Sequence, residues 1–211
     1  REKTGKNYDS RTKHEIYNEF KKKDKDIKVI VHPTSYISEN SNFIPLSGIS
    51  SSKTIFCNEN GYYSIYQSDR HGFNNPDYEW DSKEIEYLLV GDSFTHGACV
   101  NRPHDIASVL RQLSNKSTLN LGYVGNGSLI HYATIKEYLN PKVNKILWMF
   151  FEGNDLLDLS FELTSKKFKN YLENDDFNQN LKYRQIEIDN IANQKIISGH
   201  TERVKEIKKK I

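Results

Sequence analysis

The residue best suited to do chemistry is Ser93, whose hydroxyl can act as a nucleophile. It stands at the end of the stretch Leu88-Leu89-Val90-Gly91-Asp92-Ser93, which begins with apolar residues. Two more apolar stretches end in small or polar residues, one leading to Gly125 and the next to Asn154. An apolar run that stops abruptly is typical of a buried strand passing into a turn. Open parallel sheets form their sites at the carboxyl ends of strands, so we expect these three turns to converge.

The three residue types fit acyl chemistry. A serine hydroxyl attacks a carbonyl carbon once an adjacent base takes its proton. The oxygen of the tetrahedral intermediate then carries negative charge, and fixed N–H donors around it lower the barrier. Gly125 allows close approach of its backbone N–H, and Asn154 offers N–H donors without a competing charge. The alternative is that Ser93 only caps the helix that follows it.

These motifs resemble blocks I, II and III of the SGNH (GDSL-type) hydrolases. The matching residues, in the family's order within roughly 85–160, are Gly91-Asp92-Ser93, Asn120-Leu121-Gly122 with Gly125, and Gly153-Asn154-Asp155. The resemblance implies that Ser93 is the nucleophile. It also implies an oxyanion hole made by the backbone N–H groups of Ser93 and Gly125 and the side-chain amide of Asn154. Asp92 then supports the turn.

The family takes its base from a fourth block, Asp-x-x-His, which does not occur in this sequence. None of the seven histidines has Asp three residues before it: His14, His32, His71, His96, His104, His131 and His200. We interpret the chain as a fragment that ends before the base, or as a relative that has lost catalysis. His96 and His200 remain as alternative bases. Residues 1–211 alone are then expected to show little or no turnover, with the cleft open on one side.

Composition bounds the other possibilities. Hydrophobic residues make up 36% of the chain, charged residues 27%, and the formal net charge is +2. The basic residues near both ends accompany no nucleic-acid motif, so no nucleic-acid partner is expected. No apolar run is long enough to cross a membrane, so attachment is expected only through a segment upstream of Arg1. Cys57 and Cys99 form no metal-binding motif and leave the redox compartment open.

Two other motifs suggest different ligands. The glycines of 122–127 could present a helix N-terminus to a phosphate, but their spacing differs from that of a dinucleotide-binding loop. A metal is the second alternative, and its candidate ligands are Asp92, Glu152, Asp155 and Asp158. Asp92 is better explained by the turn, and Asp155 and Asp158 by the first turns of a helix. We expect neither a cofactor nor a metal site.

Strands and helices alternate over 85–160. The predicted strands are 86–91, 117–121 and 145–151, and the predicted helices are 104–114, 127–139 and 155–163. Helical crossovers between strands imply a parallel sheet, and apolar runs without alternation indicate strands covered on both faces. The expected fold class is α/β. We expect residues 85–211 to form a three-layer α/β/α domain of the SGNH or flavodoxin-like kind, truncated at its C-terminus.

Residues 1–84 are expected to form an N-terminal extension and a β-rich entry region, with a helix over 11–23 and a strand over 27–31. The residues around Asn60-Gly61 fit a hairpin with a two-residue turn. The loop 68–76 resembles the entry loop of SGNH-like proteins from bacterial cell-surface polysaccharide systems. Residues 164–211 indicate one or two helices. Their predicted inner face consists of Phe168, Tyr171, Leu172, Phe177, Leu181 and Ile188.

The sequence therefore predicts two classes of function. The first is a serine esterase or O-acyltransferase that acts on acyl, chiefly acetyl, esters of a saccharide through an acyl-enzyme on Ser93. The second is a non-catalytic carbohydrate-binding or assembly module that retains the fold. The expected partner is a small acyl ester or a saccharide. The resemblance to polysaccharide systems favours an extracytoplasmic or cell-envelope location.

Overall fold

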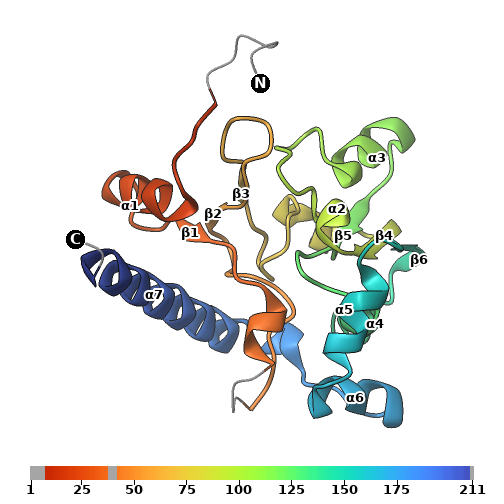
Figure 1. Cartoon of the computed structure of the whole chain (residues 1–211). Coiled ribbons are helices and arrows are strands. Elements are labelled where there is room, and N and C mark those ends of the chain that lie inside the picture. Colours follow the sequence, from red (N-terminus) through yellow and green to blue (C-terminus); the bar gives the residue numbers. More distant parts are fainter. Residues whose placement is uncertain (1–7, 38–41, 210–211) are drawn as a thin grey trace.

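The computed structural model describes residues 8–37 and 42–209. This part of the chain is a mixed α/β protein with seven α-helices and two three-stranded sheets. In Figure 1 the two sheets lie side by side, with α1 (Lys13–Lys23) and α7 (Gln185–Lys209) beside the first and α3 (Ile106–Ser114) beside the second. None of the described helices combines the length and hydrophobicity that a membrane span requires.

The second sheet is entirely parallel. Its central strand β4 (Ile85–Gly91) pairs with β5 (Thr118–Asn120) on one side and β6 (Val143–Met149) on the other. Leu88 lies opposite Leu119 in β5 and Ile146 in β6. Helix α3 connects β4 to β5, and α4 (Ser128–Tyr138) connects β5 to β6. The predicted parallel sheet with helical connections is therefore confirmed.

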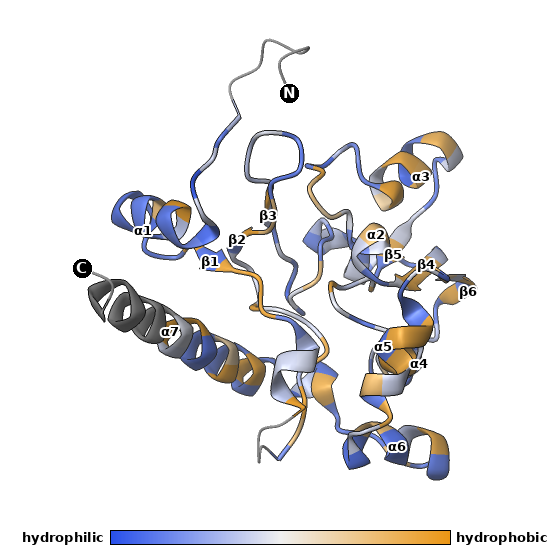
Figure 2. Ribbon diagram, viewed as in Figure 1, coloured by the Kyte–Doolittle hydropathy of each residue, from blue (hydrophilic) through white to orange (hydrophobic). Residues whose placement is uncertain are grey.

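The prediction that β6 is covered on both faces is wrong. Leu88, Leu89 and Val90 of β4 are fully buried, but Ile146 and Trp148 of β6 are 42% and 45% exposed. In the described part of the chain β6 pairs with β4 alone and so forms a sheet edge. Figure 2 shows hydrophobic residues on β6 and along α5 (Asp155–Glu162), which follows it in the chain. A continuous apolar run indicates a strand but does not reveal whether a neighbour covers it.

The first sheet belongs to the N-terminal region. Strand β1 (Lys28–Val29) is parallel to β2 (Lys53–Ile55), which is antiparallel to β3 (Ile65–Gln67). The predicted hairpin is present, but its two-residue turn is wrong. Phe56 N donates to Ser64 O and Ser64 N donates to Cys57 O, so the loop lies between Cys57 and Ser64.

Helix α1 begins at Lys13, two residues after its predicted start, and ends at Lys23 as predicted. Thr12 and Glu15 form a capping box, which satisfies backbone N–H groups that have no partner within the helix. Ile16 is buried against Ile27 and Ile55, so one apolar stripe holds α1 on the first sheet. Pro33 ends the extended segment after β1 and starts a short 3₁₀ helix, Pro33–Tyr36.

The C-terminal part consists of α6 (Lys166–Glu173), a 3₁₀ turn (Leu181–Tyr183) and α7. The predicted inner face is largely confirmed, because Phe168, Tyr171, Leu181 and Ile188 are fully buried and Phe177 is partly buried. The assignment of Leu172 to this face is wrong, since its side chain is 55% exposed. Helix α7 returns to the N-terminal region, where the Asp189 carboxylate accepts hydrogen bonds from Ser50 N at 2.9 Å and Ser50 Oγ at 2.6 Å.

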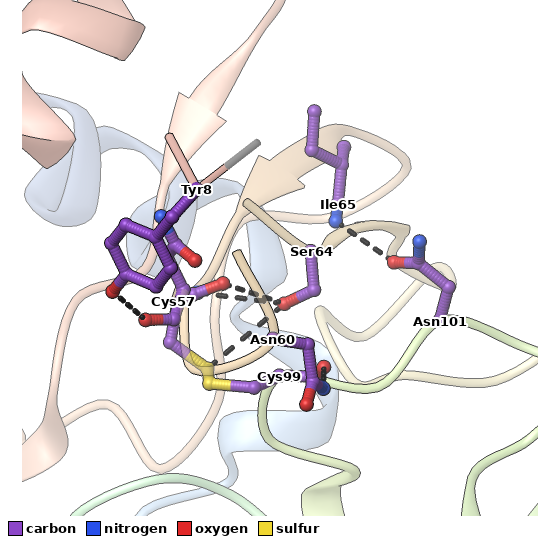
Figure 3. The surroundings of a disulfide bond; sticks show 8 residues. Tyr8, Cys57, Asn60, Ser64, Ile65, Cys99 and Asn101 are labelled. Atoms are coloured by element: carbon purple, nitrogen blue, oxygen red, sulfur yellow. Dashed lines mark hydrogen bonds between the residues drawn. A yellow bond between two sulfur atoms is a disulfide. The ribbon is translucent and has the colours of Figure 1, made fainter. Parts of the chain in front are cut away.

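A disulfide joins Cys57 to Cys99 and so links the hairpin loop to the segment after α2 (Ser93–His96). Figure 3 shows two hydrogen bonds that reinforce the link. Asn60 Nδ2 donates to Cys99 O at 3.0 Å, and Ile65 N donates to Asn101 Oδ1 at 3.2 Å. The N-terminal region is therefore tied to the chain segment that follows Ser93.

Replacing both cysteines with serine is expected to lower the free energy of unfolding by about 2–4 kcal/mol, because the disulfide restricts the unfolded chain. The cysteines are 42 residues apart. Urea unfolding with and without a reductant measures the effect. The reductant should destabilise the natural sequence and leave the double variant unchanged. Two titratable thiols in the denatured, unreduced protein would contradict the pairing.

Candidate active site

Ser93 lies in the turn between the central strand β4 and helix α2. The Asp92 carboxylate accepts a hydrogen bond from Phe94 N at 2.9 Å, so Asp92, not Ser93, caps α2. The alternative role of Ser93 as the helix cap is therefore wrong. Ser93 is half-buried, and its hydroxyl makes no hydrogen bond to any residue that the structure describes. Its side chain is left available at the carboxyl end of the strand.

The loop after β5 is bound to the Ser93 turn. Asn120 Nδ2 donates to Thr95 O of α2 at 2.7 Å, and Asn120 Oδ1 accepts from Gly122 N at 2.8 Å. Gly125 is half-buried and has a φ of 72°, which favours glycine. A Cβ at this position would lie 2.7 Å from Nδ1 of His32. The sequence offered no signal for this contact, because His32 precedes the short 3₁₀ helix of the N-terminal region.

The N-terminus of α4 is occupied by a carboxylate from α5. Glu162 accepts hydrogen bonds from Gly127 N at 2.5 Å, Leu129 N at 3.0 Å and Ile130 N at 3.3 Å. The alternative that this helix N-terminus holds a phosphate is therefore wrong, because Glu162 already takes its donors. Burial raises the pKa of Glu162 to about 7, and the three N–H bonds, which lower the pKa, offset this only in part.

Asn154 ends the turn after β6 and immediately precedes α5. Its Nδ2 donates to Asp158 Oδ2 at 2.8 Å. An ionised carboxylate only accepts hydrogen bonds, so this contact fixes the orientation of the amide and leaves its second N–H for another acceptor. Burial raises the pKa of Asp92, and the nearby Asn154 side chain offsets this only slightly.

The three strand-end turns meet through these contacts. Asn154 interacts with Asp92 from the turn after β4 and with Asp158 in α5. Asp158 also packs against the loop after β5, since a Cβ on Gly127 would lie 2.6 Å from Asp158 Cβ. The sequence-predicted residues Ser93, Gly125 and Asn154 therefore belong to three loops that contact one another.

The acidic residues near Ser93 support the backbone. Asp155 accepts a hydrogen bond from Phe151 N at 2.8 Å and so closes the turn before α5. Burial raises its pKa, and the neighbouring Asp92 and Asp158 raise it further. Among the described side chains, those of residues 8–37 and 42–199, no three His, Cys, Asp or Glu form a group able to hold a metal ion.

Two histidines near the site have other roles. The His96 ring is fully buried among Phe56, Tyr66 and Tyr123, at centroid distances of 4.5–5.0 Å. Burial lowers its pKa to about 3, so His96 is unsuited to act as the base for Ser93. His131 Nδ1 accepts from Trp148 Nε1 at 3.2 Å, so its Nε2 carries the proton and donates to Asn126 O at 3.1 Å.

The side chain of His200, the other alternative base, lies outside the described residues.

A cavity of about 330 Å³ opens beside the Ser93 turn, on the β6 side. Asp92, Phe94 and Thr95 line it from the turn, and residues 148–151 line it from β6 and its exit. The rings of Phe94 and Phe151 lie 4.9 Å apart. Sequence reasoning missed both aromatic residues, although Phe94 directly follows Ser93 and Phe151 precedes the Gly153-Asn154-Asp155 motif.

Comparisons of the chain with protein-family models, curated proteins and solved structures find no match.

Replacing Gly125 with alanine is expected to destabilise the protein. The left-handed backbone conformation costs about 1–2 kcal/mol for an L-residue, and contact with His32 adds to this. Adding His32→Ala should recover the contact energy but not the backbone strain. Urea unfolding measures both variants. Gly199→Ala in α7 is the matched control and should be neutral or stabilising, because its Cβ meets no atom within 4 Å. Unchanged stability of Gly125→Ala would contradict the geometry.

Glu162→Gln tests the pKa at the α4 N-terminus. Because burial raises the pKa of Glu162 in the folded state, its contribution to stability is present below about pH 4.5 and is lost as the pH rises through about 7. The stability difference between the natural sequence and Glu162→Gln should shrink by up to roughly 3 kcal/mol over this range. Urea unfolding at both ends of the range measures it. A stability difference that grows with pH would mean that the N–H donors lower the pKa of Glu162 more than burial raises it, which would contradict the prediction.

Proposed function

We propose that this chain is the scaffold of an SGNH-type serine esterase or O-acyltransferase with a three-layer α/β/α fold, acting on acyl esters of a saccharide. The observation that supports it best is the contact among the three loops that carry Ser93, Gly125 and Asn154. These loops follow three neighbouring parallel strands, which is where sites of open α/β sheets form. Helix α3 contacts β5 and α4 contacts β4, which is compatible with helical layers on the sheet.

In the proposed reaction Ser93 Oγ attacks the ester carbonyl carbon, and a base takes the hydroxyl proton. The carbonyl oxygen becomes an oxyanion, which accepts hydrogen bonds from the N–H groups of Ser93 and Gly125 and from Asn154 Nδ2. The tetrahedral intermediate collapses, the alcohol leaves with a proton, and the acyl group stays on Ser93. Water or a sugar hydroxyl then takes the acyl group, which gives hydrolysis or transfer.

The environment of Asn154 suits this role. One N–H of its amide is bound to Asp158, so the side chain is already oriented before the oxyanion forms. A donor that is already oriented stabilises developing charge without the cost of reorganisation. Asp92 has the corresponding task at α2, where it fixes the backbone that begins at Ser93.

Two further observations agree with a saccharide ester as substrate and with the expected location. Phe94, Phe150 and Phe151 expose apolar ring surface at the cavity beside Ser93, where the C–H faces of a sugar can pack. The Cys57–Cys99 disulfide is typical of proteins in oxidising compartments, which favours an extracytoplasmic or cell-envelope location.

The second candidate is a non-catalytic carbohydrate-binding or assembly module. It is favoured by the surroundings of His96 and His131, because the first ring is buried in the core and both nitrogens of the second are engaged. Neither histidine can serve as a base for Ser93. The two candidates therefore differ in whether a base reaches the Ser93 hydroxyl.

Ser93→Ala should lower the rate of acyl cleavage or transfer by roughly a thousandfold or more, because the nucleophile is lost. Asn154→Ala should lower kcat by about 100- to 1,000-fold, as expected for removal of one oxyanion donor. The assay follows release of acetate from an acetylated oligosaccharide and its transfer to a second sugar.

Ser114→Ala is the matched control, since this hydroxyl donates to Leu110 O and accepts from Lys116 N at the end of α3, away from the Ser93 turn. It should leave the rate unchanged. If Ser93→Ala retains full activity, the chemistry takes place elsewhere. If the natural sequence shows no turnover but binds the oligosaccharide as tightly as Ser93→Ala, the binding module is the correct function.

A further inference from the structure

A second cavity, of about 380 Å³, lies among α1, β1, the 3₁₀ helix that starts at Pro33, and α7. In Figure 1 these elements lie on the side of the molecule away from α3 and β6, so this cavity is distinct from the one beside Ser93. Its apolar wall includes Val29, Val31 and Ile196. Its volume falls within the range of about 300–1,000 Å³ that is typical of small-molecule sites.

The charged residues that line this cavity all have basic side chains. Lys13 and His14 come from α1, His32 from the segment after β1, and Lys195 from α7. No Asp or Glu is among its lining residues in the described part of the chain. Lys195 Nζ donates to Ser35 O at 3.0 Å, and its ammonium lies over the Tyr36 ring. The side chains that can be charged near neutral pH and line the cavity in the described part of the chain are therefore all basic.

Lys13 and His32 carry the argument for a ligand. Within the described residues neither side chain takes part in an ion pair or hydrogen bond. Burial lowers the pKa of Lys13, and burial together with the charge of Lys13 lowers the pKa of His32. Near neutral pH His32 is therefore a neutral imidazole that can donate an N–H, whereas the positive charge of Lys13 is poorly solvated. An anion bound between them would supply the missing counter-charge.

We propose that this cavity binds an amphipathic anion, with a single carboxylate head group beside Lys13 and His32 and a short apolar chain against Val29, Val31 and Ile196. A purely apolar ligand would leave the Lys13 ammonium without a counter-charge. A small inorganic anion would leave the apolar wall in contact with water. The inference rests on this cavity alone and holds whether or not Ser93 is a nucleophile.

The cavity also borders the candidate active site. The His32 ring lines the cavity, and it lies against Gly125 in the loop after β5. An anion held by His32 is therefore expected to stiffen the Gly125 loop from the outside, without entering the cavity beside Ser93.

The test is isothermal titration calorimetry of the whole chain with octanoate, 1-octanol and acetate. Octanoate should bind saturably with one-to-one stoichiometry. Octanol, which lacks the charge, and acetate, which lacks the chain, should each bind at least about tenfold more weakly. Lys13→Gln and His32→Gln should each weaken octanoate binding by about tenfold, as expected for loss of a charged hydrogen bond. Lys83→Gln is the matched control, because Lys83 is exposed and does not line the cavity.

A second variant, Val31→Phe, fills the apolar wall and should abolish octanoate binding without changing any charge. Unfolding curves show whether each variant remains folded, and the exposed position of Lys83 makes its variant a reference for them. Three results would overturn the proposal: no saturable binding of octanoate, equal binding of octanol, or unchanged binding in Lys13→Gln. Loss of acyl transfer in Ser93→Ala has no bearing on the outcome, so the two proposals fail separately.

Discussion

The buried carboxylate of Asp69 is the interaction on which the arrangement of the candidate site depends. It accepts hydrogen bonds at 2.8–3.0 Å from two backbone N–H groups of its own loop and from the side chains of Asn75 and Trp80. Asp69 is fully buried, and an unsatisfied charge there would cost several kcal/mol. Burial raises its pKa to about 6, because the four hydrogen bonds, which lower the pKa, offset burial only in part.

The same loop reaches the Ser93 turn through a chain of amides. Asn75 donates to Asn120 O and accepts from Asn120 N, both at 2.8 Å, and Asn120 donates to Thr95 O of α2. Asn74 donates to His96 O at 2.9 Å, which holds the other end of α2. The N-terminal region therefore supplies no proposed catalytic group, yet it fixes the helix on which Ser93 stands. A change in the loop would displace the nucleophile without touching it.

The sequence was sufficient to predict those parts of the structure that follow from a local pattern of residues. The apolar stretches gave strands β4, β5 and β6, and the turns at their ends placed Ser93, Gly125 and Asn154 on three neighbouring loops. It failed where the decisive partner is distant in sequence. Glu162 binds Gly127 N at the α4 N-terminus, 35 residues earlier in the sequence, and His32 contacts Gly125 from the N-terminal region. The exposure of β6 belongs to the same class, because a strand's own residues do not say which neighbour covers it.

The contacts that bring the three loops together also set the electrostatics of the site. Asp92, Asp155 and Asp158 gather where the loops meet, and the first and last of these raise the pKa of Asp155. A substrate that carried its own negative charge would be repelled by these carboxylates at close range. An oxyanion that forms only during the reaction meets the fixed N–H donors at the same moment, so its charge is compensated locally. For the proposed reaction, this arrangement fits a neutral sugar ester better than an anionic one. The negative charge of the oxyanion would then be stabilised by the N–H groups of Ser93, Gly125 and Asn154.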